Sequence, residues 1–231
     1  MAFKKKSSIV LIIFIVTIFL YHFYNKLEVK KTYFPIKHIE IISNFNNVNK
    51  NTVSKRSEIY LKEKSFFNFN IKNLKKEIEK IEWVKSVNVR RVYPDKVKIF
   101  IVEHKAIAIW NNKEYFNKSG KLFKVNKISK NLPKLNSKNN QNVKMFNYLS
   151  SFTKHLSKNN INDKIIKIEE NEIRSIKIFL YSGININFGS RNIDNRIKTF
   201  FKIYKKLKSS DLKKIRYIDM RYSNGFSIGW K

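Results

Sequence analysis

The residue types that carry most enzyme chemistry are scarce or scattered in this sequence. It contains no cysteine, which excludes disulfides and thiolate metal sites. Its four histidines show no ligand-like spacing to one another or to carboxylates. Its five glycines build no phosphate-binding loop, and no serine lies in a nucleophile-elbow pattern. The sequence therefore predicts no metal, no cofactor and no small-molecule substrate.

The nearest approach to an acid–base pair is Glu103 followed by His104. Both lie on a predicted strand, where neighbouring side chains point to opposite faces, so structural roles are expected for them. Asp219, also on a predicted strand, is interpreted as a structural hydrogen-bonding group. We do not expect an enzyme.

An uncharged run of sixteen residues, 9–24, follows three lysines near the N-terminus. At about 1.5 Å per residue the run covers roughly 24 Å, slightly less than a hydrocarbon core of about 30 Å. Flanking lysines can snorkel to supply the missing length. The run predicts one transmembrane helix over residues 9–25. A cleaved signal peptide is the alternative, although no small-residue cleavage site follows, and a buried core helix would rarely be so uniformly apolar.

The charges around this run indicate its orientation. Lys4, Lys5 and Lys6 favour a cytoplasmic tail over residues 1–8, and long downstream domains cross the membrane largely regardless of charge. We therefore expect the bulk of the chain to be periplasmic, anchored by one membrane span.

The formal net charge of +32 invites a nucleic-acid interpretation. However, 41 of the 49 cations are lysines, and these are spread along the whole chain. Lysine, asparagine, isoleucine and phenylalanine have A/T-rich codons, so a biased genome explains the charge without a ligand. We expect no specific nucleic acid. Binding of an anionic polymer, either nucleic acid or cell-wall polymer, remains the alternative function.

After a polar connector over residues 25–33, the first folded segment is predicted as strand, helix, helix, strand, strand. The strand covers residues 36–42, and the first helix covers residues 53–61 with a cap at Asn51 or Thr52. Asn70 is the expected cap of the second helix. That helix carries one apolar stripe at spacings of three and four residues: Ile71, Leu74, Ile78 and Ile81. The stripe is expected to pack on the sheet.

A hairpin is predicted to follow these helices. Val87 and Val89 alternate with polar residues, and the same alternation returns at residues 97–101. Tyr93-Pro94-Asp95-Lys96 between them suits a tight turn. The overall fold class is therefore α+β.

The second unit, residues 105–231, is expected to be mixed and strand-rich. Short strands around Tyr115 and Phe123 flank a turn, and residues 126–142 are interpreted as a loop containing Pro133. One helix covers residues 143–156, and a second begins after a cap at Asn192. Further strands are predicted at 165–168, 173–181 and 184–188. A final hairpin pairs residues 215–222 with 226–230 about Asn224-Gly225, a strong hairpin signal.

The motifs, in this order, resemble the FtsQ/DivIB family of bacterial cell-division proteins over the whole chain. Residues 34–104 resemble its POTRA domain in Phe66-Phe67, Trp83-Val84, Tyr93-Pro94-Asp95 and Val102-Glu103-His104, with Tyr93 where tryptophan is commoner. Residues 108–123 resemble its central segment. YIDMRYSNGFSIGW, residues 217–230, is similar to its C-terminal signature. The chain departs from the family pattern by stopping one residue after Trp230, without a polar tail.

The resemblance implies a non-enzymatic scaffold in the inner membrane at the division septum. It would link early and late septum-assembly proteins and bind bitopic partners of the FtsB and FtsL type. By motif position it implies a partner site at the C-terminal hairpin, formed by Arg221, Tyr222, Asn224, Gly225 and Trp230, with Arg196 on the preceding helix as a further candidate.

The last strand offers a physical basis for that site, because one of its sides is expected to be an unpaired sheet edge. A partner segment could add there as a strand, with Arg221 pairing a partner carboxylate and Tyr222 and Trp230 serving as aromatic anchors. In the alternative interpretation, Tyr222 and Trp230 are core residues that close the domain.

Overall fold

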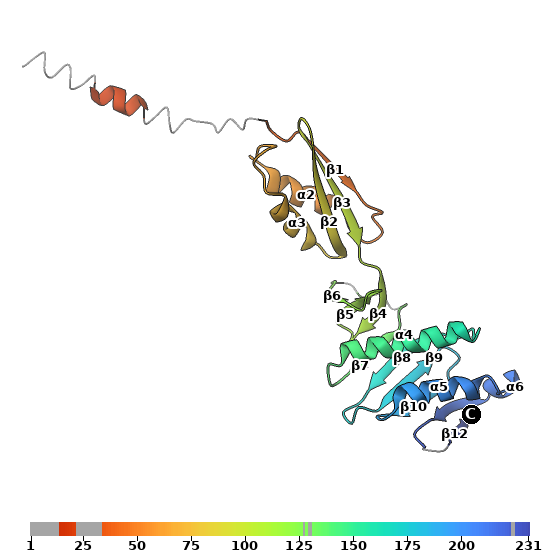
Figure 1. Cartoon of the computed structure of the whole chain (residues 1–231). Coiled ribbons are helices and arrows are strands. Elements are labelled where there is room, and N and C mark those ends of the chain that lie inside the picture. Colours follow the sequence, from red (N-terminus) through yellow and green to blue (C-terminus); the bar gives the residue numbers. More distant parts are fainter. Residues whose placement is uncertain (1–13, 22–33, 127, 129–130, 223–224) are drawn as a thin grey trace, which may run out of the picture. The chain divides into compact units, whose positions relative to one another are not determined.

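The computed structural model describes residues 14–21, 34–126, 128, 131–222 and 225–231, which are coloured in Figure 1. The chain divides into two compact units, residues 1–103 and 104–231. Residues 14–21 are helical, and the other residues of the predicted transmembrane run lie outside the described residues. Among the described residues, no helix has both the length and the apolar character needed to cross a membrane.

The N-terminal unit has the predicted order of strand, helix, helix, strand, strand. Its elements are β1 (His38–Ile42), α2 (Lys50–Leu61), α3 (Ile71–Glu79), β2 (Val84–Val92) and β3 (Lys96–Glu103). β3 lies in the centre of the three-stranded sheet, parallel to β1 and antiparallel to β2. The predicted hairpin is confirmed, because Val92 pairs with Lys96 around the three-residue turn at Tyr93-Pro94-Asp95.

Both helices of this unit begin at asparagine caps, one of which was predicted wrongly. Asn70 caps α3 as expected, since its side chain accepts a hydrogen bond from the Asn73 N–H. The first helix begins earlier than predicted. Its cap is Asn49, whose side chain accepts from the N–H groups of Asn51 and Thr52, the two residues expected to be caps.

The core of the unit lies between the helices and one face of the sheet. Leu74 and Ile78 are fully buried against Val87, Val97 and Ile99. Ile71 and Ile81 are half-buried at the edge of the same cluster. The apolar stripe of the second helix therefore packs on the sheet, as predicted.

The C-terminal unit is built on one sheet of nine described strands. Its helices are α4 (Asn142–Lys158), α5 (Ile193–Tyr204) and the short α6 (Ser209–Leu212). Its strands are β4 (Ala106–Trp110), β5 (Glu114–Asn117), β6 (Leu122–Phe123), β7 (Lys134–Ser137), β8 (Ile165–Glu170), β9 (Ile176–Leu180), β10 (Asn185–Gly189), β11 (Ile215–Asp219) and β12 (Ser227–Trp230). They are ordered β12-β11-β10-β9-β8-β7-β4-β5-β6 across the sheet.

β7 corrects the interpretation of residues 126–142 as a loop. This four-residue strand lies between β4 and β8 and runs parallel to both. Only Leu135 of its side chains joins the apolar core. Asn111 holds the end of β7 through the backbone of Ser137, and the Ser137 hydroxyl donates to the buried Glu170 carboxylate. Pairing on both sides, not an apolar pattern, makes this segment a strand.

Two other predicted elements differ in detail. β9 begins at Ile176, later than predicted, because residues 171–175 form a turn in which the Asn171 side chain accepts from the Ser175 N–H at 2.8 Å. Asn192 precedes α5 as expected, but it has a left-handed φ of 51° and its side chain makes no capping hydrogen bond. The helix nevertheless begins at the predicted position.

α4 and α5 lie over one face of the sheet, as Figure 1 shows. Between them the rings of Phe152, Phe200 and Phe201 meet, with centroids 4.8 to 5.6 Å apart. These rings join the buried side chains of the central strands in one cluster. The other face of β10 carries the partly exposed Asn185 and Asn187, and that of β9 carries the exposed Lys177 and the half-buried Phe179, which is close to the alternation expected for a sheet with one covered face.

Candidate functional site

The last strand forms an edge of the C-terminal sheet. β12 pairs antiparallel with β11, with Ile218 opposite Ile228 and Asp219 opposite Ser227. On its other side β12 has no strand neighbour among the described residues. An edge of this kind offers backbone donors and acceptors to an added strand.

β12 packs closely against β11 on both faces of the sheet. Ile228 packs on the core beside the fully buried Ile218. On the opposite face of the sheet, the ring of Tyr217 lies directly over Gly229, its cross-strand partner. A Cβ atom on residue 229 would overlap that ring, so only glycine allows this approach. The contacts of Ile228 with the core and of Gly229 with the Tyr217 ring therefore hold β12 in place.

Tyr222 and Trp230 are both exposed, Trp230 as the last residue of β12 and Tyr222 in the connection between β11 and β12. Their side chains are 59% and 53% exposed, and Phe226 between them in sequence is also exposed. The interpretation in which Tyr222 and Trp230 are core residues is therefore wrong. Large aromatic side chains left partly in water beside a free strand edge are typical of binding hot spots.

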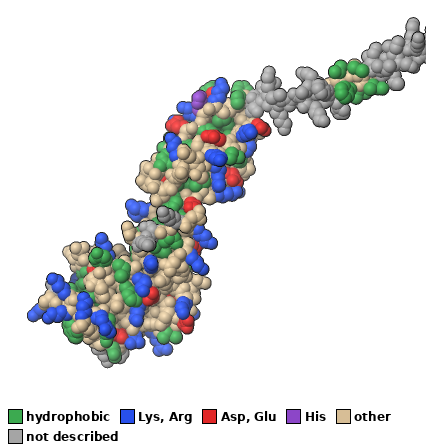
Figure 2. Space-filling view, turned by 180° about the vertical axis from the view of Figure 1, so that it is seen from behind, with side chains coloured by type: hydrophobic (Ala, Val, Ile, Leu, Met, Phe, Trp, Pro, Cys, Tyr) green, Lys and Arg blue, Asp and Glu red, His purple; other side chains and the backbone are tan. Residues whose placement is uncertain are grey.

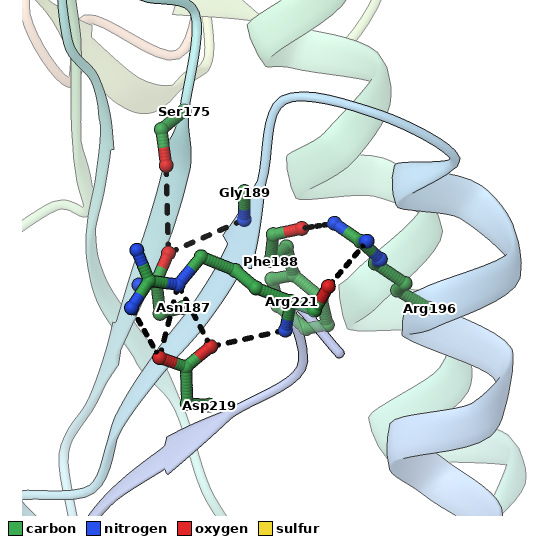
Figure 3. Close-up of polar contacts among 7 residues, drawn as sticks. All are labelled: Ser175, Asn187, Phe188, Gly189, Arg196, Asp219 and Arg221. Atoms are coloured by element: carbon green, nitrogen blue, oxygen red, sulfur yellow. Dashed lines mark hydrogen bonds and ion pairs between the residues drawn. The ribbon is translucent and has the colours of Figure 1, made fainter. Parts of the chain in front are cut away.

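Arg221 is paired within the chain. Its Nε lies 3.0 Å from both carboxylate oxygens of Asp219, and its Nη2 lies 2.7 Å from Oδ2, so the guanidinium and carboxylate form a bidentate pair (Figure 3). The expectation that Arg221 pairs a partner carboxylate is not supported by this geometry. Asp219 is a structural hydrogen-bonding group, as expected. Its pairing with Arg221 was not predicted, although the spacing of two residues could have indicated a pair on one face of an extended segment.

β11 ends at Asp219, three residues earlier than predicted. The Oδ1 atom of Asp219 accepts from the Arg221 N–H at 3.0 Å, which draws the chain out of the strand. Burial disfavours the charged carboxylate, but hydrogen bonds from Arg221 and the charges of Arg221 and Arg196 outweigh it. The pKa of Asp219 is therefore lowered.

Arg196, on α5, ties this segment to the neighbouring strand. Its Nη1 donates to the Phe188 carbonyl at 2.6 Å and its Nη2 donates to the Arg221 carbonyl at 2.8 Å (Figure 3). Arg196 and Arg221 both crowd Gly189, which has a φ of 69° and leaves no room for a side chain. The structure thus brings Arg196 and Arg221 together, in positioning roles.

The predicted turn residues are only partly described. Asn224 lies outside the described residues, and Gly225 is exposed, with open space where a side chain would be. The antiparallel pairing of the hairpin is confirmed, and Asp219 opposite Ser227 is the pair nearest the turn. The turn about Asn224-Gly225 includes a residue outside the described residues and stays a prediction.

Glu103 and His104 have separate structural roles, as expected. The Glu103 carboxylate accepts from the N–H groups of Asn46, Asn47 and Val48 and from the Ser43 hydroxyl, which fixes the turn after β1. The His104 ring stacks on Phe123 with centroids 4.1 Å apart. No cluster of three or more potential metal ligands occurs among the described residues.

The chain thus combines a strand–helix–helix–strand–strand unit of the POTRA type with a strand-rich unit whose last strand is an edge. Two family models match the chain: "POTRA domain, FtsQ-type" over residues 34–104, and "Cell division protein FtsQ/DivIB, C-terminal" over residues 108–221. The chain is 29% identical over 168 residues to the cell division protein FtsQ of Coxiella burnetii, covering 72% of this chain and 68% of that protein. The corresponding protein of Haemophilus influenzae is 28% identical over 169 residues, covering 72% and 66%. That of Methylomonas methanica is 28% identical over 202 residues, covering 85% and 79%.

This chain belongs to the FtsQ/DivIB family of bacterial cell-division proteins. The resemblance expected from the sequence is therefore confirmed, and with it a non-enzymatic role in cell division. The match spans about two thirds of the Coxiella and Haemophilus relatives, at 68% and 66% of their length.

Proposed function

We propose that this chain is a membrane-anchored scaffold of the division machinery that binds other bitopic division proteins, of the FtsB and FtsL type, through its C-terminal unit. The observation that carries the proposal is the free side of β12, with the exposed Trp230 on this strand and the exposed Tyr222 in the connection that leads to it. Family membership supports division as the setting for this surface.

A partner segment would add to β12 as a further strand. Main-chain hydrogen bonds to the edge would supply affinity, and contacts with the aromatic side chains would supply specificity. Tyr222 and Trp230 are the anchors in this proposal. Arg221 and Arg196 act differently from the sequence-based expectation, because their guanidinium groups are occupied by Asp219 and by backbone carbonyls. They hold the segment that presents Tyr222, and Gly225 and Asn224 belong to the same connection.

We place the protein in the inner membrane at the division septum. One span over residues 9–25 leaves residues 1–8 in the cytoplasm and the two folded units, proposed as 34–104 and 105–231, in the periplasm. The uncharged run and its lysine flank support this arrangement. A scaffold anchored in this way can link early and late septum-assembly proteins.

The test compares two anchor variants with a matched control. We expect Tyr222→Ala and Trp230→Ala each to abolish co-purification of FtsB- and FtsL-type partners in high salt, with thermal unfolding unchanged. Tyr181→Ala, which removes an exposed tyrosine elsewhere in the same unit, should retain binding. Equal loss of binding and folding in the anchor variants, or undiminished binding in both, contradicts the proposal.

One observation favours a second candidate, the binding of an anionic polymer. Six exposed cations and one carboxylate lie within residues 205–216, and Figure 2 shows lysine and arginine side chains gathered at one end of this unit. Among the described residues these cations have no ion pair: Lys205, Lys206, Lys208, Lys213, Lys214 and Arg216. Binding carried by these cations should collapse between about 50 and 200 mM salt, whereas a specific protein partner should remain bound.

A further inference from the structure

Three exposed aromatic side chains meet at one end of the N-terminal unit. Phe34, Phe67 and Tyr93 are 57%, 60% and 75% exposed. They surround the buried ring of Phe66, whose centroid lies 5.1 Å from that of Phe67 and 6.3 Å from that of Tyr93, and Phe34 lies 5.3 Å from Phe67. We call Phe34, Phe66, Phe67 and Tyr93 the aromatic tip. A contiguous apolar patch of this kind on a folded unit marks an interaction surface.

The aromatic tip is held in place by its backbone. The Phe66 N–H donates to the Phe34 carbonyl at 2.8 Å, and Pro35 forms a bridge with Ser65. Arg91, from β2, donates to the Phe69 carbonyl at 2.5 Å and lies over the Phe69 ring, with its Cζ atom 4.3 Å from the centroid. Three segments distant in the sequence therefore present their rings together, and the exposed rings need no rearrangement to bind.

Chain connectivity limits where the tip can be. Phe34 is ten residues after Tyr24, the last residue of the uncharged run, so a fully extended connector holds the tip within about 35 Å of the end of that run. Figure 1 shows the β2–β3 turn and the start of the unit at the same end. β3 then leads away from the tip over eight residues, about 26 Å. The connector therefore joins the unit at its aromatic end, which is the end that can reach the membrane with the shortest stretch of chain.

Cations accompany the rings. Lys62 and Lys64 lie in the loop just before Ser65, and Lys37 lies three residues after Phe34. Lys37 and Lys62 are exposed, whereas Lys64 is half-buried with its ammonium over the Tyr60 ring. Phenylalanine and tyrosine rings beside lysines suit the boundary between acyl chains and headgroups, where rings enter the interface and cations meet anionic headgroups.

We propose that the aromatic tip docks on the bilayer surface, with an anionic lipid membrane as its partner. This inference rests on the membrane anchor of the proposed function. The short connector acts as a tether that keeps the aromatic tip near the bilayer. The effective concentration of lipid at the tip is therefore high, which favours docking. Docking gives the N-terminal unit a fixed end at the membrane.

The test uses the cysteine-free sequence, in which any introduced cysteine is unique. Lys62→Cys places an environment-sensitive dye beside the tip, and Lys85→Cys places the same dye on an exposed lysine near the opposite end of the sheet. The full chain is reconstituted in vesicles of phosphatidylethanolamine and phosphatidylglycerol that carry a spin label near the headgroups. We expect severalfold stronger quenching at residue 62 than at residue 85.

A second variant separates docking from anchoring. Phe34→Ser, Phe67→Ser and Tyr93→Ser combined in the Lys62→Cys chain should remove the excess quenching without changing thermal unfolding or flotation with the vesicles. Equal quenching at the two positions of a floating chain, or excess quenching that survives the serine changes, overturns the proposal alone. Excess quenching that needs co-reconstituted division proteins also overturns it, because the partner is then a protein. A chain that does not float with the vesicles overturns the anchor and the docking together.

Discussion

The ring of Tyr217 lies across the face of Gly229, its partner on the neighbouring edge strand. An aromatic ring over a cross-strand glycine covers the backbone that glycine leaves bare and sets the position of β12. Any side chain at residue 229 must displace the ring, so the shape of the proposed binding edge depends on this one pair.

We expect Gly229→Ala to weaken partner binding, because the new methyl group pushes the Tyr217 ring away and loosens β12. Backbone amide exchange in β11 and β12 should increase as well. Ser182→Ala is the control, since Ser182 is an exposed turn residue elsewhere in the same unit, and it should behave as the parent chain does. Restoration of binding by Tyr217→Ser in the Gly229→Ala chain would confirm the steric cause, and unchanged exchange in Gly229→Ala would contradict it.

The Asp219–Arg221 pair predicts a pH dependence of stability. Because the pKa of Asp219 is lowered in the folded state, its contribution is complete at pH values well above that of an unfolded aspartate, about 3.9, and is lost as the pH falls through the folded-state value. Asp219→Asn should cost about 1.5–3 kcal/mol of unfolding free energy at pH 7, as for hydrogen bonds to charged groups.

Denaturant unfolding at a series of pH values measures this effect. The difference between the parent chain and Asp219→Asn should shrink below about pH 4. The control is Glu172→Gln, which removes an ion pair with Lys138 whose two side chains are both largely exposed, and it should change stability much less. A difference for Asp219→Asn that stays constant down to acid pH would exclude the ionised pair as its source.

Ile78→Asp should unfold the N-terminal unit. Ile78 is fully buried between α3 and the sheet, burial of such a side chain is worth about 1.5–3 kcal/mol, and the new carboxylate adds a desolvation cost. Loss of the thermal transition of this unit is the expected readout. Ile59→Asp, on the exposed side of α2, should shift stability by no more than about 0.5 kcal/mol. An unchanged thermal transition in Ile78→Asp would contradict the packing of this face of α3 against the sheet.

The proposed topology has a direct test. Protease added to intact spheroplasts should degrade the C-terminal unit, while a tag fused before Met1 should survive until the membrane is opened. Both results follow if the chain crosses once with its lysine-flanked end inside. Protection of the C-terminal unit in intact spheroplasts would refute this orientation.

The elements that were predicted correctly are those encoded by local patterns. The stripe of α3 and the alternation of β2 and β3 are visible in short windows because one face of each is buried. β7 has no such pattern, since Leu135 alone of its residues joins the core and the strand exists through its two parallel neighbours. Parallel pairing joins residues far apart in the sequence, and short windows do not contain that information.

The candidate site was predictable in its position but not in its chemistry. The hairpin signal located the edge strand, and resemblance to the family indicated Tyr222 and Trp230. Whether these two rings are buried depends on how much of the protein covers the edge of the sheet. The alternation of polar and apolar residues does not encode that coverage. Arg221 was assigned to a partner through its motif position in the resembling family. Its pairing with Asp219 was not predicted, because the spacing of two residues is only a weak signal and the turn of the chain after residue 219 is not visible in the sequence.

The parallel pairing of β1 with β3 determines how the N-terminal unit carries mechanical load. The chain enters at the start of β1 and leaves at the end of β3, and these strands are hydrogen-bonded neighbours running in the same direction. Tension between a membrane anchor and a partner held by the C-terminal unit would pull the two strands past each other. Such shear loads the hydrogen bonds of the ladder together, whereas opposed pulling on one end of a hairpin breaks them singly. A constricting septum would therefore strain this unit in its most resistant direction.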